Sequence, residues 1–297
     1  MNKMDLVHDV QLYYREREKF EKSFVGRMSH TQRLRIHPLL FRIISYRNNK
    51  AGFTIQTIYD RRGTFSGPKI FCVTHIGKYD IEAVTEVIKD HYYLLSGDYE
   101  NMKGTVEEKF LGLNGVVYIR EDDKADRTLS KEKMIQILLN GGNMLYFPEG
   151  TWNLTPNLPV LPCAYGIFDV AMRSGAMIIP IGIEQYDKLF ISAVGEPFDV
   201  SLYHESEKTD AISDLRGVLT GLKMDIWANA PQSYKEDVDK EKFDNLITQR
   251  ISEWTQPLQV LLDSVFKPKG QAEPEEVFEH LHTLIPCREN AFLLRER

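Results

Sequence analysis

A histidine and an aspartate lie five positions apart in the segment THIGKYD, at His75 and Asp80. His75 directly follows the apolar run KIFCVT, and Asp80 opens a segment with the apolar spacing of a helix. A histidine can take a proton from a hydroxyl group near neutral pH when a carboxylate fixes its tautomer and stabilises the imidazolium. The spacing therefore predicts a general base whose Nδ1 faces Asp80 and whose Nε2 faces a substrate. The structural alternative is a strand-end histidine beside an aspartate that caps a helix.

A second pattern, FPEGT at Phe147–Thr151, directly follows the apolar segment NMLY. Pro148 and Gly150 favour a turn, and that turn would present Glu149 at the end of a strand. The structural alternative is a glutamate in an ordinary strand-end turn. However, a given five-residue string is expected far less than once in a chain of 297 residues, and His75 lies 74 residues before Glu149.

The two patterns together resemble those of the glycerolipid acyltransferase family, whose best-known members acylate lysophosphatidate. A third block of that family, a proline inside a β-branched strand, is matched by IIPIG at Ile178–Gly182. The resemblance covers roughly residues 53–200. It implies acyl transfer without a covalent enzyme intermediate. His75, oriented by Asp80, would be the general base on an acceptor hydroxyl, whose oxygen would attack the thioester carbonyl of acyl-CoA or acyl carrier protein.

The resemblance also implies roles for neighbouring residues. Backbone N–H groups of Ile76 and Gly77, at a helix start, would stabilise the oxyanion. The glutamate of the FPEGT block is usually assigned to acceptor binding or to site architecture. The expected substrate-binding residues are Glu149, Gly150, Thr151, Arg120 and Trp152. No cofactor is implied beyond the acyl-CoA or acyl carrier protein co-substrate, and no metal, because neither H-E-x-x-H nor a zinc-type cysteine pair occurs.

Several positions depart from the family pattern. The family commonly continues FPEGT with Arg-Ser, but this chain has Trp152 and Asn153, and Ala164 stands where a lysine is usual. The missing arginine and lysine are the residues expected to bind an acceptor phosphate. One alternative is an acceptor without the usual glycerol phosphate, with Trp152 as an apolar or sugar-stacking wall. The other alternative is that different cations supply the charge: Lys78, Arg120, Lys124 or Arg127.

Apolar segments alternate with helical segments through the region that contains these motifs. Strands are predicted at 53–59, 69–74, 91–95, 116–119, 143–147 and 177–183, and helices at 80–90, 105–113, 126–140 and 164–174. This alternation predicts an α/β fold, acyltransferase-like, with a mostly parallel or mixed sheet flanked by helices. Active groups of such sheets gather at the carboxyl ends of the strands, where His75 and Glu149 are expected.

Three regions are predicted along the chain. Residues 1–52 form a basic N-terminal segment with an amphipathic helix, residues 53–200 the acyltransferase core, and residues 201–297 a helical C-terminal extension without a recognisable catalytic pattern. A helix starting at Pro38 would bury Leu39, Leu40, Ile43 and Ile44 on one side. It would either lie in a membrane interface, with arginines near anionic headgroups, or pack on the core of the protein itself.

The charge distribution and the apolar content constrain the partners. The net charge is −6, yet residues 1–70 carry 14 Lys and Arg against 6 Asp and Glu. A basic leading segment on an acidic body favours an anionic surface such as a membrane over nucleic acid. No apolar run has the length of a signal peptide or of a membrane-spanning helix, so membrane contact would be peripheral. The three cysteines are widely spaced and fit a reducing cytoplasm.

The expected function is therefore acyl transfer from acyl-CoA or acyl carrier protein to a hydroxyl acceptor in glycerophospholipid synthesis. The expected location is the cytoplasm, with peripheral contact at the inner face of the cell membrane. Two other functions are compatible with the motifs: thioester hydrolysis by the same base, and lipid binding by a degenerate site. A serine-nucleophile hydrolase is disfavoured because no G-x-S-x-G occurs.

Overall fold

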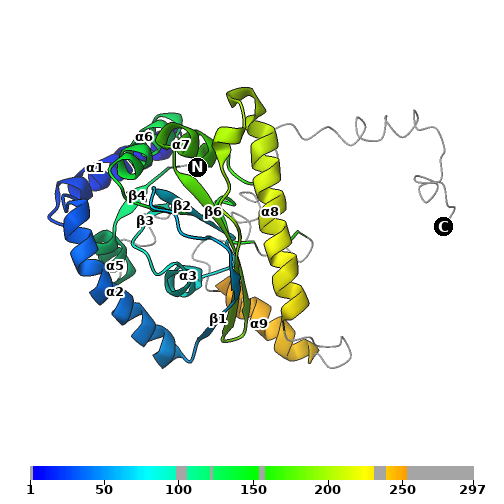
Figure 1. Cartoon of the computed structure of the whole chain (residues 1–297). Coiled ribbons are helices and arrows are strands. Elements are labelled where there is room, and N and C mark those ends of the chain that lie inside the picture. The colour runs from blue at the N-terminus through cyan, green and yellow to red at the C-terminus, as the bar shows by residue number, and fades with distance from the viewer. Residues whose placement is uncertain (1–2, 98–105, 121–122, 154–157, 231–238, 253–297) are drawn as a thin grey trace. The chain divides into compact units, whose positions relative to one another are not determined.

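The computed structural model describes residues 3–97, 106–120, 123–153, 158–230 and 239–252. All of these residues belong to one compact unit, Met1–Gln256. Within them, seven strands form one sheet in the order β1-β7-β6-β2-β5-β3-β4 (Figure 1). The strands are β1 Thr54–Asp60, β2 Lys69–Val73, β3 Tyr93–Ser96, β4 Val116–Tyr118, β5 Met144–Tyr146, β6 Met177–Tyr186 and β7 Leu189–Val194.

Helices cover both faces of this sheet, because the central strand β2 is apolar on both sides. Ile70 and Cys72 pack in one hydrophobic cluster, with α6, α7 and α8, whereas Phe71 and Val73 pack in a second cluster, with α3 and α5. Figure 1 shows α8 running along β6, to which it is packed. The helices of the two layers are α3 Asp80–Ile88, α5 Val106–Asn114, α6 Lys124–Leu139, α7 Gly166–Ser174 and α8 Lys208–Asn229.

The sheet is mixed, which confirms the predicted fold class. β6, β2, β5, β3 and β4 are parallel to one another, β7 is antiparallel to β6, and β1 is parallel to β7. The strand Leu189–Val194 was not among the predicted strands. This strand follows β6 across a tight turn in which Asp187 has a positive φ of 54°. The hairpin was missed because β6 ends in the polar residues Glu184 and Gln185, which are only partly buried and do not continue the apolar run.

The predicted start of the second helix, at Pro38, is wrong. α2 spans His30–Ala51 and begins at a capping box, in which the Ser29 hydroxyl accepts from the Gln32 N–H and the Gln32 side chain accepts from the Ser29 N–H. Pro38 lies inside the helix. It is tolerated there because it lies on the exposed side, where water can bond the carbonyl that proline leaves without a partner.

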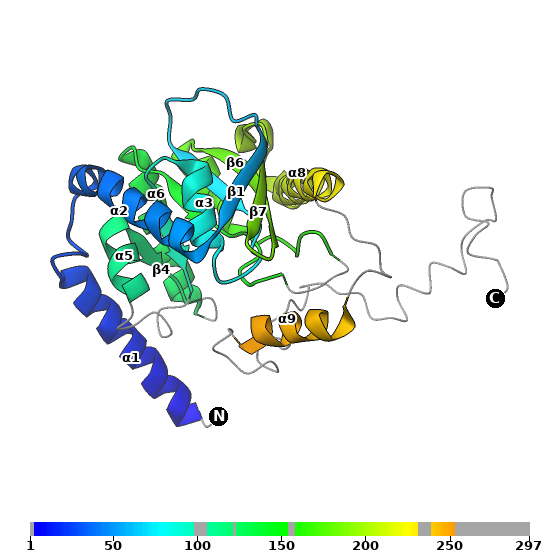
Figure 2. The same cartoon turned by 90° about the horizontal axis from the view of Figure 1, so that it is seen from below.

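The predicted buried face of this helix is also only half right. Leu40 and Ile44 are buried at 4% and 2% exposure, but Leu39 is 60% exposed and Ile43 is 43% exposed. The helix packs on α3 and α5, which lie beside it in Figure 2. Tyr46, one turn beyond Ile43, is 67% exposed. α2 therefore packs on the protein with one face and presents a second apolar stripe to the surroundings.

The first helix, α1 Lys3–Lys22, which the sequence analysis did not assign, is anchored by one buried carboxylate. Asp126 of α6 is fully buried and forms an ion pair with Arg17. Its other oxygen accepts from the Tyr13 hydroxyl at 3.1 Å and from the backbone N–H of Arg120 at 2.7 Å. A buried carboxylate needs such partners to offset its desolvation. Asp126 thus joins α1 to the end of β4.

Three histidines gather where α2 meets the sheet. His91 lies edge-on to His30 and to His37, with 5.4 Å between ring centroids in each pair, and Arg33 is buried beside them. The ring nitrogen Nε2 of His91 donates to the Asn114 carbonyl over 2.6 Å. Burial, reinforced by the neighbouring histidines and Arg33, lowers the pKa of His91 from 6.5 to about 4.

This cluster predicts acid sensitivity. Because the pKa of His91 is lower in the folded state than in the unfolded state, the unfolded chain binds the proton more readily. Stability should fall by about 1.4 kcal/mol per pH unit as the pH drops from 6.5 toward 4. Urea unfolding at pH 6.5 and pH 5 should therefore show a smaller loss in His91→Gln than in wild type. The control is His204→Asn at an exposed helix cap. Equal losses in wild type and His91→Gln would contradict this assignment.

The remaining described elements belong to the predicted C-terminal extension. They are η1 Val200–Leu202, η2 Glu205–Glu207, α8 and α9 Lys240–Ser252. Of these, η1 begins at the last residue of the predicted core and ends inside the extension. The part of the predicted extension from residue 253 onward, with Cys287, lies outside the described residues. The three regional boundaries stay a prediction.

Candidate active site

His75 lies at the carboxyl end of β2, and its position is fixed by hydrogen bonds between the preceding residue, Thr74, and the neighbouring strand β6. Thr74 is fully buried; its backbone N–H donates to the Ile181 carbonyl, and its hydroxyl accepts from the Ile183 N–H at 3.0 Å. The chain then leaves the sheet, and the backbone carbonyl of His75 accepts from the Asn153 N–H at 2.7 Å. His75 is therefore held between β6 and the loop that follows β5.

The carboxylate of Asp80 orients the imidazole. Its Oδ2 lies 2.6 Å from Nδ1 of His75, and the Asp80 side chain is only 1% exposed while that of His75 is 18% exposed. An ionised carboxylate can only accept, so Nδ1 carries the hydrogen and Nε2 keeps its lone pair. The structure thus places the predicted pair in contact, with the basic nitrogen directed away from Asp80.

The same oxygen of Asp80 also closes the turn before α3. It accepts from the backbone N–H of Ile76 at 3.1 Å and of Gly77 at 3.2 Å. These two N–H groups were predicted to stabilise an oxyanion. Here they are occupied by Asp80, and an N–H group that already donates to a buried carboxylate offers little to a second anion. Both N–H groups help to orient Asp80 in this structure, and the oxyanion role expected for them stays a prediction.

Glu149 fixes the backbone around the site. One of its oxygens accepts from the His75 N–H at 2.8 Å, and the other accepts from the Leu161 N–H at 2.7 Å. Burial raises the pKa of Glu149 above its ordinary value, and these two backbone hydrogen bonds offset only part of that rise. Of the two roles implied by the family resemblance, this geometry matches site architecture, because both carboxylate oxygens are directed at the protein backbone.

The other members of the FPEGT block surround this carboxylate. Gly150 has a positive φ of 68°, which favours glycine, and its N–H closes the turn onto the Phe147 carbonyl. Within the described part of the chain, the buried hydroxyl of Thr151 has no hydrogen-bond partner. The substrate-binding roles expected for Gly150 and Thr151 stay predictions.

Two aromatic rings enclose the imidazole. The Phe147 ring stacks on it, with centroids 4.2 Å apart and planes 21° apart. The Trp152 ring meets it at 89°, with centroids 6.3 Å apart. Trp152 therefore lies beside His75, and its expected role as a wall of the acceptor site stays a prediction.

Arg120 lies on the same edge of the sheet but is not placed in contact with His75. It follows β4, three strands from β2 in the sheet order, or roughly 14 Å at the usual strand spacing. Its guanidinium carbon lies 5.9 Å from the centroid of the Tyr13 ring of α1. Its predicted role in substrate binding stays a prediction.

Residues outside the predicted set also support the site. Arg216 of α8 donates from Nε and Nη2 to the Val160 carbonyl, at 3.1 and 2.8 Å. Val160 directly precedes Leu161, whose N–H donates to Glu149. Arg216 therefore attaches this loop to α8 next to its contact with Glu149. No local sequence pattern marks Arg216, because its partner lies 56 positions away.

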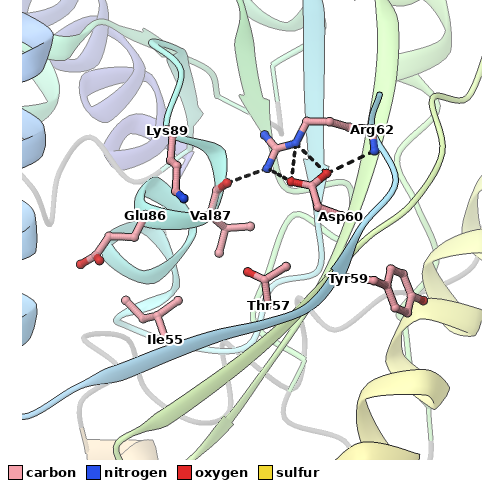
Figure 3. Close-up of a pocket in the computed structure, with 8 residues that line it drawn as sticks. All are labelled: Ile55, Thr57, Tyr59, Asp60, Arg62, Glu86, Val87 and Lys89. Carbon is pink, nitrogen blue, oxygen red and sulfur yellow. Dashed lines mark hydrogen bonds and ion pairs between the residues drawn. The ribbon is translucent and has the colours of Figure 1, made fainter. Parts of the chain in front are cut away.

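A cavity of about 420 Å³ lies elsewhere, between β1 and α3 (Figure 3). Arg62 borders it, bonded to Asp60 and to the Val87 carbonyl, and Lys89 lies on the opposite wall. These residues belong to the end of β1 and the end of α3, near the amino end of β2, whereas His75 follows the carboxyl end. This cavity is therefore separate from the His75–Asp80 pair.

A buried carboxylate that orients an imidazole at the carboxyl edge of an α/β sheet is an arrangement that can activate a nucleophile by general base catalysis. Residues 54–184 match the family model described as Acyltransferase. The matched residues include His75, Asp80 and Glu149, and through this acyltransferase domain the chain is an acyl-transferring enzyme.

The fold is similar to that of a solved enzyme. The crystal structure of the 1-acyl-sn-glycerophosphate (LPA) acyltransferase PlsC from Thermotoga maritima aligns with a TM-score of 0.54 and 16% identity. The alignment covers 71% of this chain and 87% of that chain. At this identity the likeness concerns the fold. A comparison with curated proteins gave no match.

Proposed function

We propose that this enzyme transfers a fatty acyl group from acyl-CoA or acyl carrier protein to a hydroxyl group of a glycerolipid acceptor, in phospholipid synthesis. The observation that carries the proposal is the 2.6 Å contact between Nδ1 of His75 and Asp80. Nε2 takes the proton of the hydroxyl as its oxygen attacks the thioester carbonyl. The carbon–sulfur bond then breaks, and the imidazolium returns the proton to the leaving thiolate.

The two described cysteines support direct transfer to the acceptor. Burial raises the pKa of Cys163 to about 12, and it raises the pKa of Cys72 well above its ordinary value. A thiol must ionise to act as a nucleophile, so neither is suited to hold an acyl group. This agrees with a mechanism in which the acceptor oxygen attacks the thioester itself.

A screen of donors against acceptors tests the proposal. Labelled acyl-CoA and acyl carrier protein would each be incubated with lysophosphatidate, glycerol phosphate, and a panel of sugars and amino alcohols. We expect an acylated product with at least one glycerolipid acceptor, absent in His75→Ala. If only sugars or amino alcohols are acylated, the acyl transfer stands and the glycerolipid assignment is wrong.

Trp152 favours a second candidate, an acceptor without a phosphate. Its ring lies beside the imidazole, at the position where the family commonly has an arginine. An indole stacks well on a sugar ring or packs against an apolar group, but it cannot pair with a phosphate. The same screen separates the two acceptor classes.

We also propose that α2 binds the inner face of the cell membrane from the cytoplasm. The exposed residues Leu39, Ile43 and Tyr46 lie along one side of the helix, and the exposed Arg35 and Arg42 flank them. An apolar stripe beside arginines fits the interface of an anionic bilayer. Among the described helices, none combines the length and the apolar character needed to cross a membrane.

Liposome binding tests this surface. Leu39, Ile43 and Tyr46 would be replaced together by serine, because the buried Leu40 and Ile44 support the fold. Wild type should pellet with anionic vesicles and be partly released by high salt, which screens surface charge. The triple variant should stay in the supernatant. Leu202→Ser, an exposed leucine on another element, is the control. Equal recovery of wild type and triple variant would exclude this surface.

A further inference from the structure

Phe147 belongs to the FPEGT block, yet no role in the reaction has been given to its side chain. It directly follows β5, which pairs with β2, so its ring reaches the imidazole from the neighbouring strand. The two rings are nearly parallel, at 21°, with their centroids 4.2 Å apart. The face of a benzene ring carries negative charge density, which attracts a cation that lies over it.

We propose that Phe147 is a positioning residue for His75 that fixes the imidazole plane and stabilises the imidazolium. The proposal rests on the proposed function of His75 as general base. The single hydrogen bond from Nδ1 to Asp80 would still let the ring tilt about that bond. Stacking on Phe147 restricts the tilt, so Nε2 stays directed at the acceptor hydroxyl.

The same contact acts on the proton transfer. When Nε2 takes the hydroxyl proton, a positive charge forms on the ring above Phe147. The carboxylate of Asp80 faces this charge from α3, and the carboxylate of Glu149 lies at the His75 backbone. Phe147 adds a neutral surface that favours the cation without competing for Nε2 or for the hydrogen of Nδ1.

The test replaces Phe147 with leucine, which removes the aromatic face, and with tyrosine, which retains it. Phe198→Leu is a matched control, because Phe198 is also half-buried and stacks at 21° on Tyr203, away from His75. The ring proton resonance of His75, identified by its loss in His75→Ala, would be followed by NMR as a function of pH without substrate. This readout does not depend on acyl transfer.

In Phe147→Leu, the midpoint of the His75 titration should fall by about half to one pH unit, the scale of a lost cation–π contact. Phe147→Tyr and Phe198→Leu should titrate like wild type. The kcat of Phe147→Leu should fall by about 3- to 10-fold with KM little changed, because the stabilisation is lost in the transition state.

An unchanged midpoint in folded Phe147→Leu would overturn the proposal, even if kcat falls. Phe147→Met, a second non-aromatic variant, gives the same readout if the leucine variant does not fold. If wild type transfers no acyl group to any acceptor while the midpoint still shifts, the proposed function fails and the stacking effect stands. If transfer occurs and the midpoint does not shift, only the role of Phe147 fails.

Discussion

His75→Ala should lower the rate of acyl transfer by at least about 100-fold, the usual scale for losing a general base. The imidazole is the group that Asp80 orients, and its Nε2 is directed away from that carboxylate. Alanine leaves the acceptor hydroxyl without a base beside the thioester. The measurement is the initial rate of acylated product, with circular dichroism and thermal unfolding to confirm the fold.

Asp80→Asn should have nearly the same effect while leaving the fold intact. The asparagine oxygen can still accept from the N–H groups of Ile76 and Gly77, which preserves the turn. The same oxygen would also face Nδ1, because one oxygen of Asp80 makes all three contacts, so the amide keeps the tautomer but lacks the negative charge that stabilises the imidazolium formed on proton transfer. His204→Asn, at an exposed position, is the control. A folded His75→Ala enzyme with near-normal turnover would remove this mechanism.

The second large effect concerns the choice of acceptor. Trp152→Arg combined with Ala164→Lys should raise activity toward lysophosphatidate by roughly 10²- to 10⁴-fold. Each restored cation provides charge-assisted hydrogen bonds worth about 1.5–3 kcal/mol, at about 1.4 kcal/mol per decade. The Trp152 ring lies against the general base, so an arginine there would lie near a bound acceptor. Activity toward the natural acceptor should fall at the same time.

The rival explanation is that Arg120, which follows β4, or Arg127 of α6 already holds the phosphate. The control for added charge alone is Leu202→Arg, on an exposed leucine away from the site. Rates with lysophosphatidate would be compared in wild type, the double variant and Arg120→Ala. Efficient acylation of lysophosphatidate by wild type, lost in Arg120→Ala, would decide for the rival.

Local patterns in the sequence predicted the parts of the site that lie close together in the chain. His75 and Asp80 share one turn, so their spacing alone indicated that Asp80 could reach Nδ1. The strands that carry the motifs were predicted because central strands are continuous apolar runs. By contrast, the partners of Glu149 are backbone N–H groups 74 and 12 positions away, and no side-chain pattern records them.

Burial was the least predictable property. Leu39 and Leu40 are adjacent and equally apolar, yet one is exposed and the other is buried. The difference depends on the helical phase of α2, which is set by its start at His30 and by its packing on α3 and α5. Asp126 reads in the sequence as one of several charges before a helix. Its burial could not be predicted, because the Arg17 side chain that pairs with it lies 109 positions earlier in the chain.

The most direct test of the account is the ratio of thiol released to acceptor acylated. Acyl-CoA would be incubated with and without the best acceptor from the screen. Free thiol and acylated product would be measured in the same samples. An acyltransferase should release one thiol per acylated acceptor, release it only when the acceptor is present, and lose both products in His75→Ala. Thiol release that proceeds equally without an acceptor, and yields free fatty acid, would contradict it and identify a thioester hydrolase.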